Sequence, residues 1–538
     1  MTEAESNRET ELKLAARPED LAKLMKAQAV TSRAKGKASA KALESAYFDT
    51  PDQRLAKRLV SLRVRRSGDG YVQTVKSAPM ADGMGRGEWE GPVTGPEPDL
   101  SLLPAEALEH LGPVGAEELR LLFASHVQRT TRDVAVGDGE GASFIELAFD
   151  KGEIRTPDGE ATPLCEVELE LKRGSPAALY ELALELAQVA PLRLEPRSKA
   201  ARGYALLAGE APKAVKAAKL ELPPGTTVEG ALSRILRSCL DQIMVNEACV
   251  LFGGGPEGVH QMRVGMRRLR SALTLFRPFL PSDQYNWIVG ELKWLGSNLG
   301  PARDWDVFLA ELLAPVRAAF ARDGEHGKPV LDDIDALAAA ACARRDRAYE
   351  AARGAIRSDR YTQFLLRAGA WLESRGWRAQ PVSEHSARLF EPVEGLADQL
   401  LAKRHKKARQ AGRGFADLPP PERHEVRILL KKLRYTAEFF RSLYDDKAAR
   451  RYIQNLAAFQ DVLGHLNDVA TATRLLHELH DGDDTAERPG EPRAAGIVIG
   501  WHARGLREVE PELLSLWSGF CDVKPFWSKP ERSVQHGL

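Results

Sequence analysis

The sequence has few cysteines and no closely spaced pair of them. Its 538 residues include five cysteines, and no C-x-x-C motif suggests a thiolate metal site or a redox dithiol. No apolar run approaches the ~18 residues of a membrane-spanning helix, and the first residues are acid-rich where a secretory signal needs an apolar core. We therefore expect reduced thiols, no membrane partner and a cytoplasmic location.

The chain also lacks a net charge, because 76 Lys and Arg residues balance 76 Asp and Glu residues. This balance argues against nucleic acid as a partner, since nucleic-acid binders present a strongly basic surface. Hydrophobic residues make up 43% of the chain and charged residues 28%, which is typical of a folded globular protein. At roughly 100–200 residues per domain, the length predicts two to four domains. The sequence does not indicate an oligomeric state.

The two parts of the chain differ in hydrophobic periodicity. Residues 1–210 contain short runs in which polar and apolar residues alternate, and they end in helical patterns at 176–189 and 198–207. Alternation predicts antiparallel strands. A linker with Lys and Pro follows at 211–225, and residues 226–525 have the periodicity of long amphipathic helices. The sequence therefore predicts an α+β protein, with a β domain followed by an all-α domain.

The helical part repeats itself. The segment V-H-Q-M-R-V-G-M-R-R-L-R at 259–270 aligns with R-H-E-V-R-I-L-L-K-K-L-R at 423–434. At the same offset, L-G-P-A-R-D-W-D-V at 299–307 aligns with L-G-H-L-N-D-V-A-T at 463–471. Two blocks that agree on one offset indicate an internal duplication. We expect two related helical bundles, at about 226–385 and 386–525.

Charge in the β domain is segregated by strand. The expected strands are 8–14, 59–66, 71–76, 86–90, 144–150 and 164–172. Because side chains alternate along a strand, several of them carry charged rows on one face. These rows are Glu9, Glu11 and Lys13; Arg63 and Arg65; Arg86, Glu88 and Glu90; and Glu166, Glu168, Glu170 and Lys172.

Such rows suit two kinds of sheet. An open antiparallel sheet would carry them on its solvated face. In a closed barrel, carboxylates would line one wall and Arg and Lys the other, which suits a complex of a divalent metal with a phosphate polyanion. Paired carboxylates in a dry site raise each other's pKa unless a cation neutralises them. We therefore expect Mg²⁺ or Mn²⁺ as a cofactor.

Six motifs in this region occur together in one known family. They are E-x-E-x-K at 9–13, Y-F-D-T at 47–50, L-R-V-R at 62–65, V-K at 75–76, C-E-V-E-L-E at 165–170 and S-K-A-A-R-G-Y at 198–204. Residues 1 to about 208 resemble the CYTH, or triphosphate tunnel metalloenzyme, family, and especially its bacterial branch with an appended CHAD domain, typified by inorganic triphosphatases. The resemblance implies an eight-stranded antiparallel tunnel.

The resemblance also implies roles for individual residues. Glu11 and Lys13 would be catalytic, with Lys13 near the substrate or the attacking water. The metal ligands would be Glu9, Glu11, Asp150, Glu168 and Glu170. The triphosphate ligands would be Arg63, Arg65, Lys76, Arg129, Lys199 and Arg202, with Arg132 as the alternative to Arg129.

Basic residues form a stripe in each helical repeat. Helical spacing places His260, Arg263, Arg267 and Arg270 on one face, and the repeat does the same for His424, Arg427, Lys431 and Arg434. A third basic segment at 403–409 includes Lys403 and Lys407. These stripes are either solvated helix faces or a surface for a flexible polyanion, and aromatic residues that would stack on bases are not interleaved with them.

The repeated H-x-x-R motif with a downstream L-G-x-x-x-D resembles CHAD domains over about residues 226–520. This resemblance implies two four-helix bundles and binding of long-chain inorganic polyphosphate. We expect that binding to strengthen below about pH 6.5, where His260 and His424 would gain charge.

Together these features predict a metal-dependent hydrolase of inorganic triphosphate with a polyphosphate-binding module, which would also associate the enzyme with polyphosphate granules. One alternative keeps the tunnel but changes the substrate to an organic triphosphate, as in a thiamine or nucleoside triphosphatase or an adenylate cyclase. Another alternative is a non-catalytic polyphosphate-binding scaffold.

Overall fold

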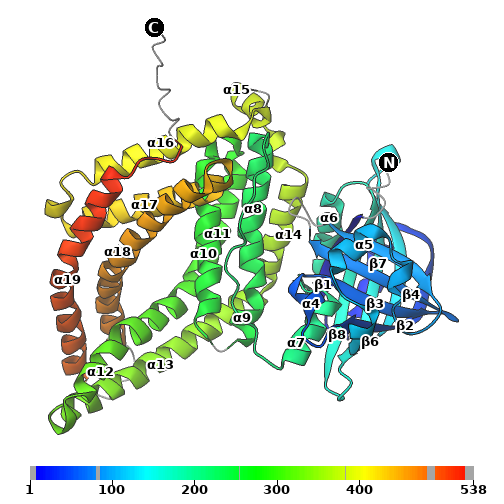
Figure 1. The fold of residues 1–538 in the computed structure, drawn as a ribbon, viewed down its shortest axis with the longest axis horizontal. Helices are drawn as coiled ribbons and strands as arrows, with labels where there is room; N and C mark the ends of the chain where they lie inside the picture. Colours follow the sequence, from blue (N-terminus) through cyan, green and yellow to red (C-terminus); the bar gives the residue numbers. More distant parts are fainter. Residues whose placement is uncertain (1–7, 80–84, 254, 382, 481–490, 528–538) are drawn as a thin grey trace. The chain divides into compact units, whose positions relative to one another are not determined.

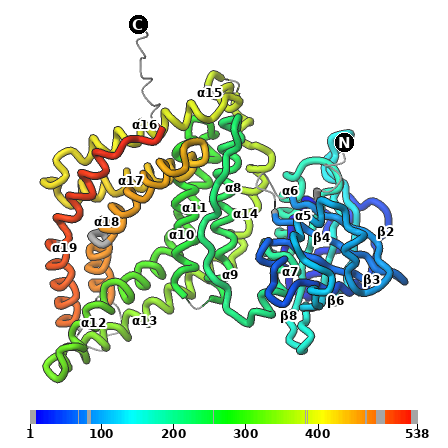
Figure 2. Tube along the Cα trace, viewed as in Figure 1, coloured from blue at the N-terminus to red at the C-terminus, as the bar shows by residue number. Residues whose placement is uncertain are grey.

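The computed structural model describes residues 8–79, 85–253, 255–381, 383–480 and 491–527. By their contacts, the residues divide into two compact units. Unit 1 comprises Met1–Lys213 with Ile356–Trp377, and unit 2 comprises Ala214–Ala355 with Arg378–Leu538. In Figures 1 and 2 the sheet of unit 1 is the blue-to-cyan part of the chain, and the long helices of unit 2 run from green to red.

Unit 1 is built on a closed antiparallel barrel. Its strands are β1 (Arg8–Ala15), β2 (Ala34–Asp49), β3 (Ser61–Ser67), β4 (Gly70–Pro79), β5 (Gly85–Val93), β6 (Arg120–Val136), β7 (Ser143–Arg155) and β8 (Ala161–Arg173). Their order is β5-β4-β3-β2-β6-β7-β8-β1, and β1 pairs with β5 to close the ring. A two-residue strand, β9 (Arg193–Leu194), pairs with the end of β1. The predicted eight-stranded tunnel is confirmed.

Two of the eight barrel strands, β2 and β6, are absent from the sequence-based set. For β2 the composition explains the omission. The first half, A-K-G-K-A-S-A-K, is solvent-exposed over most of its length, so no apolar face marks it as a strand. The start of β3 also differs from the expectation. Leu59 lies in the left-handed region with φ of 59°, so the backbone turns there and the strand begins at Ser61.

Helices pack on the barrel and inside it. They are α2 (Leu21–Met25), α3 (Gln28–Thr31), α4 (Arg54–Lys57), α5 (Ala105–Leu111), α6 (Ala177–Ala187) and α7 (Lys199–Ala208). The last two correspond to the helices expected at 176–189 and 198–207. Helix α7 packs through Ala200 against the inward-facing Phe123, Ile154 and Leu164. Lys199, at the start of α7, is thereby brought to the inside of the barrel.

One helix from the later part of the chain completes unit 1. Helix α14 (Asp359–Glu373) packs against α6 and β9. The Thr362 hydroxyl donates a 2.9 Å hydrogen bond to the Leu192 carbonyl, and a Cβ at Gly369 would lie 2.2 Å from the Tyr180 ring. Residues 356–377 fall inside the expected first helical repeat, but their contacts group them with the barrel.

Unit 2 is mostly helical in its described part, after a non-helical segment at 214–227. Its longer helices are α8 (Val228–Val245), α10 (Glu257–Leu275), α11 (Ser282–Val307), α13 (Lys328–Arg357), α16 (Val393–Ala411), α17 (Pro420–Phe440), α18 (Asp446–His480) and α19 (Glu491–Asp522), and the shorter ones are α9 (Glu247–Phe252), α12 (Ala314–Ala321) and α15 (Glu384–Ala387). Helix α10 packs against α8, α11 and α17, and α17 packs against α16 and α18. The two aligned segments of the repeat, 259–270 and 423–434, thus lie on neighbouring helices, α10 and α17. Among the described residues, no helix combines the length and apolarity needed to cross a membrane.

Candidate functional site

The barrel encloses a cavity of about 570 Å³ whose lining is almost entirely charged. The carboxylates that line it are Glu9, Glu11, Glu88, Glu90, Glu146, Glu168 and Glu170, and the cations are Lys13, Arg63, Arg65, Lys76, Arg86, Arg129, Lys172 and Lys199. Seven carboxylates thus face eight cations. Such a cavity favours a ligand that is itself an assembly of anion and cation, because either charge alone leaves one set without partners.

The charges fall into two arcs around the barrel. All seven carboxylates lie on β7, β8, β1 and β5, which are consecutive in the strand order. Arg63, Arg65, Lys76 and Arg129 lie on β3, β4 and β6 in the opposite arc. The predicted division into an acidic and a basic wall is therefore found, with three exceptions. Lys13, Arg86 and Lys172 sit within the acidic arc.

Strand register places the charged rows directly opposite one another. Glu11 pairs with Glu170 and Lys13 with Glu168 across the β1–β8 ladder. The Lys13 ammonium donates to the Glu11 carboxylate. Burial alone would raise the pKa of Glu11, but the ammonium groups of Lys13 and Lys76 outweigh that effect and lower it. Glu11 is therefore held ionised inside the barrel.

Glu9 lies at the junction of the two arcs. The Lys76 ammonium is 2.5 Å from Glu9 Oε2 and 3.3 Å from Glu88 Oε1. Burial raises the pKa of Glu9, and the charges of Glu11 and Glu88 add to this effect, which Lys76 opposes without cancelling. This end of the acidic arc therefore has more negative charge than its own cations balance, which is the condition that a divalent cation relieves.

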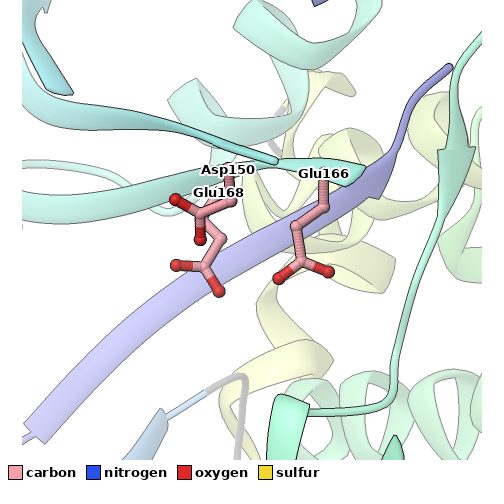
Figure 3. Close-up of side chains that lie close together, drawn as sticks. All are labelled: Asp150, Glu166 and Glu168. Atoms are coloured by element: carbon pink, nitrogen blue, oxygen red, sulfur yellow. The ribbon is translucent and has the colours of Figure 1, made fainter. Parts of the chain in front are cut away.

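A second acidic cluster lies deeper, where Asp150, Glu166 and Glu168 bring carboxylate oxygens within 4.8 Å of one another (Figure 3). Such a group has the chemistry of a metal site, but here a lysine contacts all three members. The Lys199 ammonium lies 2.8 Å from Asp150, 2.5 Å from Glu166 and 2.9 Å from Glu168. The neighbouring carboxylates raise the pKa of Lys199 against the effect of burial, so its charge is retained.

Two arginines complete the neutralisation of this cluster. Arg129 Nε and Nη2 donate to the two Asp150 oxygens at 2.8 and 2.6 Å, and Nη2 also contacts Glu168. Arg202 Nη1 is 3.2 Å from Glu166. Despite its burial, Glu168 has a pKa well below the usual range, because Lys199 and Arg129 stabilise its charge. Three carboxylates thus meet three cations, and the residues fit a metal better near Glu9 and Glu11 than here.

Three residues of the two family motifs, Asp49, Gly203 and Tyr204, position Lys199 without lining the cavity themselves. Asp49 of the Y-F-D-T segment is fully buried and accepts hydrogen bonds from the backbone N–H groups of Thr50, Leu55 and Ala56. It also accepts from the Tyr204 hydroxyl at 2.9 Å, which ties α7 to β2. Gly203 permits the close approach, since a Cβ there would lie 2.1 Å from the Phe123 ring.

The basic arc is incompletely neutralised. The Arg63 Nε is buried and has no hydrogen-bond partner among the described residues. Arg65 donates through Nε to the Ser45 hydroxyl at 3.1 Å, and burial together with Arg63 lowers the pKa of Arg65 to about 10. Closely spaced guanidinium groups with a spare donor form an anion site.

Unit 2 has its own charged cavity, of about 610 Å³. It lies where the repeated motifs converge, because Arg263 and Arg267 reach it from α10, and Arg427, Lys431 and Arg434 from α17. The equivalent aspartates of the two L-G-x-x-x-D motifs, Asp304 and Asp468, line it as well, together with Arg303. The duplication in the sequence therefore produces a single site to which both copies contribute.

Several polar groups in this cavity lack partners. Arg427 Nε and both amide atoms of Gln460 are buried with no hydrogen-bond partner in the described part of the chain. Burial lowers the pKa of Lys431 to about 7, and Arg427 and Arg267 add to the effect. Buried donors without acceptors cost free energy unless a ligand supplies them. A polyanion would supply acceptors to the two arginine-rich helices.

Comparison with known protein families identifies both units. A CYTH domain model matches residues 7–204, and a CHAD domain model matches residues 234–477. The chain carries both domains. An inorganic triphosphatase of Haemophilus influenzae is 30% identical over 171 residues, which span 30% of this chain but only 46% of that protein.

Two further relatives cover other parts of the chain. An uncharacterized protein of Mycobacterium tuberculosis is 26% identical over 458 residues, which cover 81% of this chain and 82% of that protein. The crystal structure of the CHAD domain from Ricinus communis is 30% identical and covers 58% of this chain and 98% of that chain, with a TM-score of 0.49.

The CYTH cavity gathers most of the residues expected from the sequence. Those that line it are Glu9, Glu11, Lys13, Arg63, Arg65, Lys76, Arg129, Glu168, Glu170 and Lys199. Asp150 and Arg202 are not among the lining residues; Asp150 is paired with Arg129 and Lys199, and Arg202 Nη2 donates to the Pro163 carbonyl at 2.6 Å. Arg132, the alternative to Arg129, is absent from the lining and donates to the Gly36 carbonyl at 3.4 Å.

The CHAD cavity gathers fewer of the expected residues. His260, Arg263, Arg267, Arg427, Lys431 and Arg434 line it, whereas Arg270, Lys403, Lys407 and His424 do not. Burial and the nearby Arg303 lower the pKa of His260 to about 4. Protonation of His260 is therefore disfavoured in the free protein, whereas the expected gain of charge beside a bound polyphosphate stays a prediction.

The sequence-based set missed residues that line both cavities. In the CYTH cavity Arg86, Glu88, Glu90 and Lys172 were expected as charged rows on strands but were given no role, and Glu146 was not named. Glu146 lies in the expected strand 144–150, where its alternation with apolar residues was the available signal. In the CHAD cavity Arg303, Asp304 and Asp468 belong to the repeated L-G-x-x-x-D segments, whose recurrence marked them without indicating where they point.

Proposed function

We propose that the CYTH barrel hydrolyses inorganic triphosphate with Mg²⁺ or Mn²⁺ and that the CHAD cavity binds polyphosphate. The observation that supports the first part most directly is the division of the barrel cavity into an acidic and a basic arc, in which the buried Arg63 Nε has no acceptor among the described residues. The inorganic triphosphatase of Haemophilus influenzae is similar to part of this chain, and that similarity favours the same class of reaction.

The donor set of the acidic arc fits a hard divalent cation. Glu9 and Glu11 lie on one strand, and Glu170 is directly across from Glu11, so three carboxylates face the same space. Glu170 has a single ion-pair partner on its own strand, Lys172 at 2.6 Å. We assign metal binding to Glu9, Glu11 and Glu170, with Glu168 at its margin. When bound, the metal would offset phosphate charge and make a bound water more acidic.

The basic arc would hold and orient the triphosphate. Arg63, Arg65 and Lys76 offer donors on adjacent strands, and Arg129 and Lys199 extend this set toward the deep end of the cavity. These groups stabilise negative charge on the phosphoryl oxygens without forming a covalent bond. Lys13, paired with Glu11 and opposite Glu168, lies between the two carboxylate groups and is positioned to donate to the substrate or to the attacking water. Transfer to water then requires no protein nucleophile.

A substrate panel tests this assignment. Phosphate release is measured with triphosphate, pyrophosphate, long-chain polyphosphate, ATP and thiamine triphosphate, each with Mg²⁺ and with Mn²⁺. We expect triphosphate to be the preferred substrate, because Tyr47 is the one aromatic residue among the described cavity-lining residues, and no larger aromatic surface is available for a base. Equal or faster turnover of ATP or thiamine triphosphate would replace the inorganic substrate with an organic one. No turnover of any compound with either metal would favour a binding scaffold.

Polyphosphate binding by the CHAD cavity rests on the convergence of the two basic stripes. Cations of α10 and α17 line one space, and the donors there exceed the acceptors that the described residues provide. A chain of closely spaced phosphates would neutralise both stripes and release its counterions. Titration of the full chain with long-chain polyphosphate in EDTA tests the idea, and we expect binding that weakens log-linearly with salt. Such a module would feed the barrel or locate the enzyme on polyphosphate granules.

A further inference from the structure

Four cations outside the CHAD cavity form a second basic group. Arg270 on α10 and Arg404 and Lys407 on α16 all act electrostatically on Lys432 of α17, and we call these four residues the outer cluster. None of them lines the cavity. The two groups meet at consecutive residues of α17. Lys431 lines the cavity, whereas Lys432 is exposed and belongs to the outer cluster.

Arg404 joins the three helices of the outer cluster. Its Nη1 donates to the Lys432 carbonyl at 2.6 Å and to the Ser271 hydroxyl at 3.3 Å. Burial lowers the pKa of Arg404 to about 10, and among the described residues no carboxylate lies close enough to this partly buried guanidinium to compensate. A cation in such a place is normally paired.

The outer cluster has no counter-charge at close range. In the described part of the chain, no carboxylate lies within ion-pair distance of Arg270, Arg404, Lys407 or Lys432. Burial lowers the pKa of Lys432, and Arg404, Lys407 and Arg270 lower it further, with Glu425 opposing them. The repulsion of Lys432 by the other three cations is therefore a cost to the folded protein that a bound anion would offset. This contrasts with the CYTH barrel, where nearly every cation faces a carboxylate.

We propose that the outer cluster is a second polyanion site, which binds the part of a long polyphosphate chain that extends beyond the CHAD cavity. This inference rests on the proposed polyphosphate binding by the cavity. A linear polyphosphate has the same charge at every unit, so a chain held in the cavity near Lys431 can continue to Lys432 on the same helix. Triphosphate would be too short to reach both groups. The outer cluster would thus make affinity depend on chain length.

A pair of charge reversals tests the proposal in the full-length chain. The variant Lys407→Glu with Lys432→Glu alters two exposed residues of the outer cluster and leaves Arg404 in place. The control, Lys406→Glu with Lys447→Glu, makes the same change in charge at exposed positions outside the cluster. Affinity for long-chain polyphosphate and for triphosphate is measured in EDTA over a range of salt concentrations. The CYTH cavity contributes equally to every variant, so differences report on the helical unit.

We expect the outer-cluster variant to lose on the order of tenfold in affinity for long-chain polyphosphate at low salt, with a shallower salt dependence. Its affinity for triphosphate and its melting temperature should match those of the wild type. Equal losses in the outer-cluster variant and the control, or a loss that is the same for triphosphate, would overturn the second site while leaving the cavity assignment intact. Absence of polyphosphate binding by the wild-type chain would instead overturn the proposed function of the CHAD cavity, and this inference with it.

Discussion

The two charged cavities of this protein differ in how their buried charges are balanced. In the CYTH barrel, acids and bases face one another across a small space, and most of them are already paired. In the CHAD cavity, arginine and lysine side chains outnumber the acids, and the Arg427 Nε and Gln460 amide have no hydrogen-bond partner among the described residues. The charges of the first cavity are largely balanced within the protein, whereas the second would take counter-charge from the proposed polyanion.

This difference follows from how each fold positions its side chains. Strand register in the barrel sets oppositely charged rows a few ångströms apart, as with Lys13 and Glu168. Helices α10 and α17 pack side by side and both direct cations into one cavity. No strand register pairs these cations with carboxylates. Preorganised charge suits chemistry on one bond, and unpaired charge suits reversible binding of a polyanion. The following predictions test that contrast.

The largest effect is expected for Glu9→Gln and Glu11→Gln. Each removes one negative charge from the acidic arc while keeping the side-chain volume, so metal-dependent triphosphate hydrolysis should fall on the order of a hundredfold or more. Polyphosphate binding in EDTA should be unchanged in both variants, since the CHAD cavity is not involved. Phosphate release and a binding titration measure the two properties, and hydrolysis within a few fold of the wild type would refute the metal assignment.

Lys199→Met should lower the unfolding free energy of the barrel. This loss should exceed the loss that a substitution of a CHAD-cavity cation causes in the helical unit. The substitution leaves Asp150, Glu166 and Glu168 without the ammonium that contacts all three, and a buried charge without its partner costs about 3 kcal/mol. Chemical denaturation followed by circular dichroism gives the difference in unfolding free energy. For comparison, Arg427→Met removes a cation whose Nε has no hydrogen-bond partner in the described part of the chain, and it should leave stability nearly unchanged. Similar losses in both variants would remove the contrast between the cavities.

Arg263→Gln and Arg427→Gln test whether both repeats serve one ligand. These residues occupy equivalent positions in the duplicated segments and line the same cavity, so each variant should lose about tenfold in affinity for polyphosphate. Triphosphate hydrolysis by the barrel should persist in both. Fluorescence titration at fixed salt makes the measurement. If one variant binds as the wild type does, the cavity is not a joint product of the repeats.

The smallest expected effect is a pH dependence that originates at Lys431. Its pKa is lowered to about 7 in the empty cavity, and a bound polyanion would raise it by favouring the charged form. The gain in affinity is therefore complete below about pH 7 and is lost as pH rises through the higher pKa of the bound state. We expect polyphosphate affinity to fall severalfold between pH 7 and 9. Lys431→Arg should flatten this profile, whereas a profile that persists in the arginine variant would place the titration elsewhere.

Much of the barrel could be predicted from the alternation of charged and apolar residues. The rows of β1, β3, β5 and β8 were visible because every second residue is charged. Strand β2 was not, since its exposed first half has no apolar face to reveal the period. In the helical part, the offset between repeats predicted related elements, but helical spacing alone could not separate Arg267, in the cavity, from Arg270, in the outer cluster.

Helix α14 shows most clearly where local pattern stops being informative. Tyr361, Phe364 and Leu365 give it an apolar face like that of its neighbours in sequence. That face predicts that the helix is buried, but it does not indicate which element the helix packs against. The structure packs it on α6 and β9, so a fragment cut at the linker 211–225 would separate α14 from the surface that covers it.

What the sequence determined by itself is the chemistry available to each unit: paired carboxylates and guanidinium groups on strands in the first, and duplicated basic stripes in the second. Those features are local, because alternation and helical spacing are properties of adjacent residues. Which charges meet was decided by the tertiary structure. Closure of β1 on β5 brings Glu9 beside Lys76, and the Asp49–Tyr204 bond ties down α7, whose Lys199 reaches the three acids. Such pairings depend on distances between segments far apart in the chain, and only the folded backbone sets those distances.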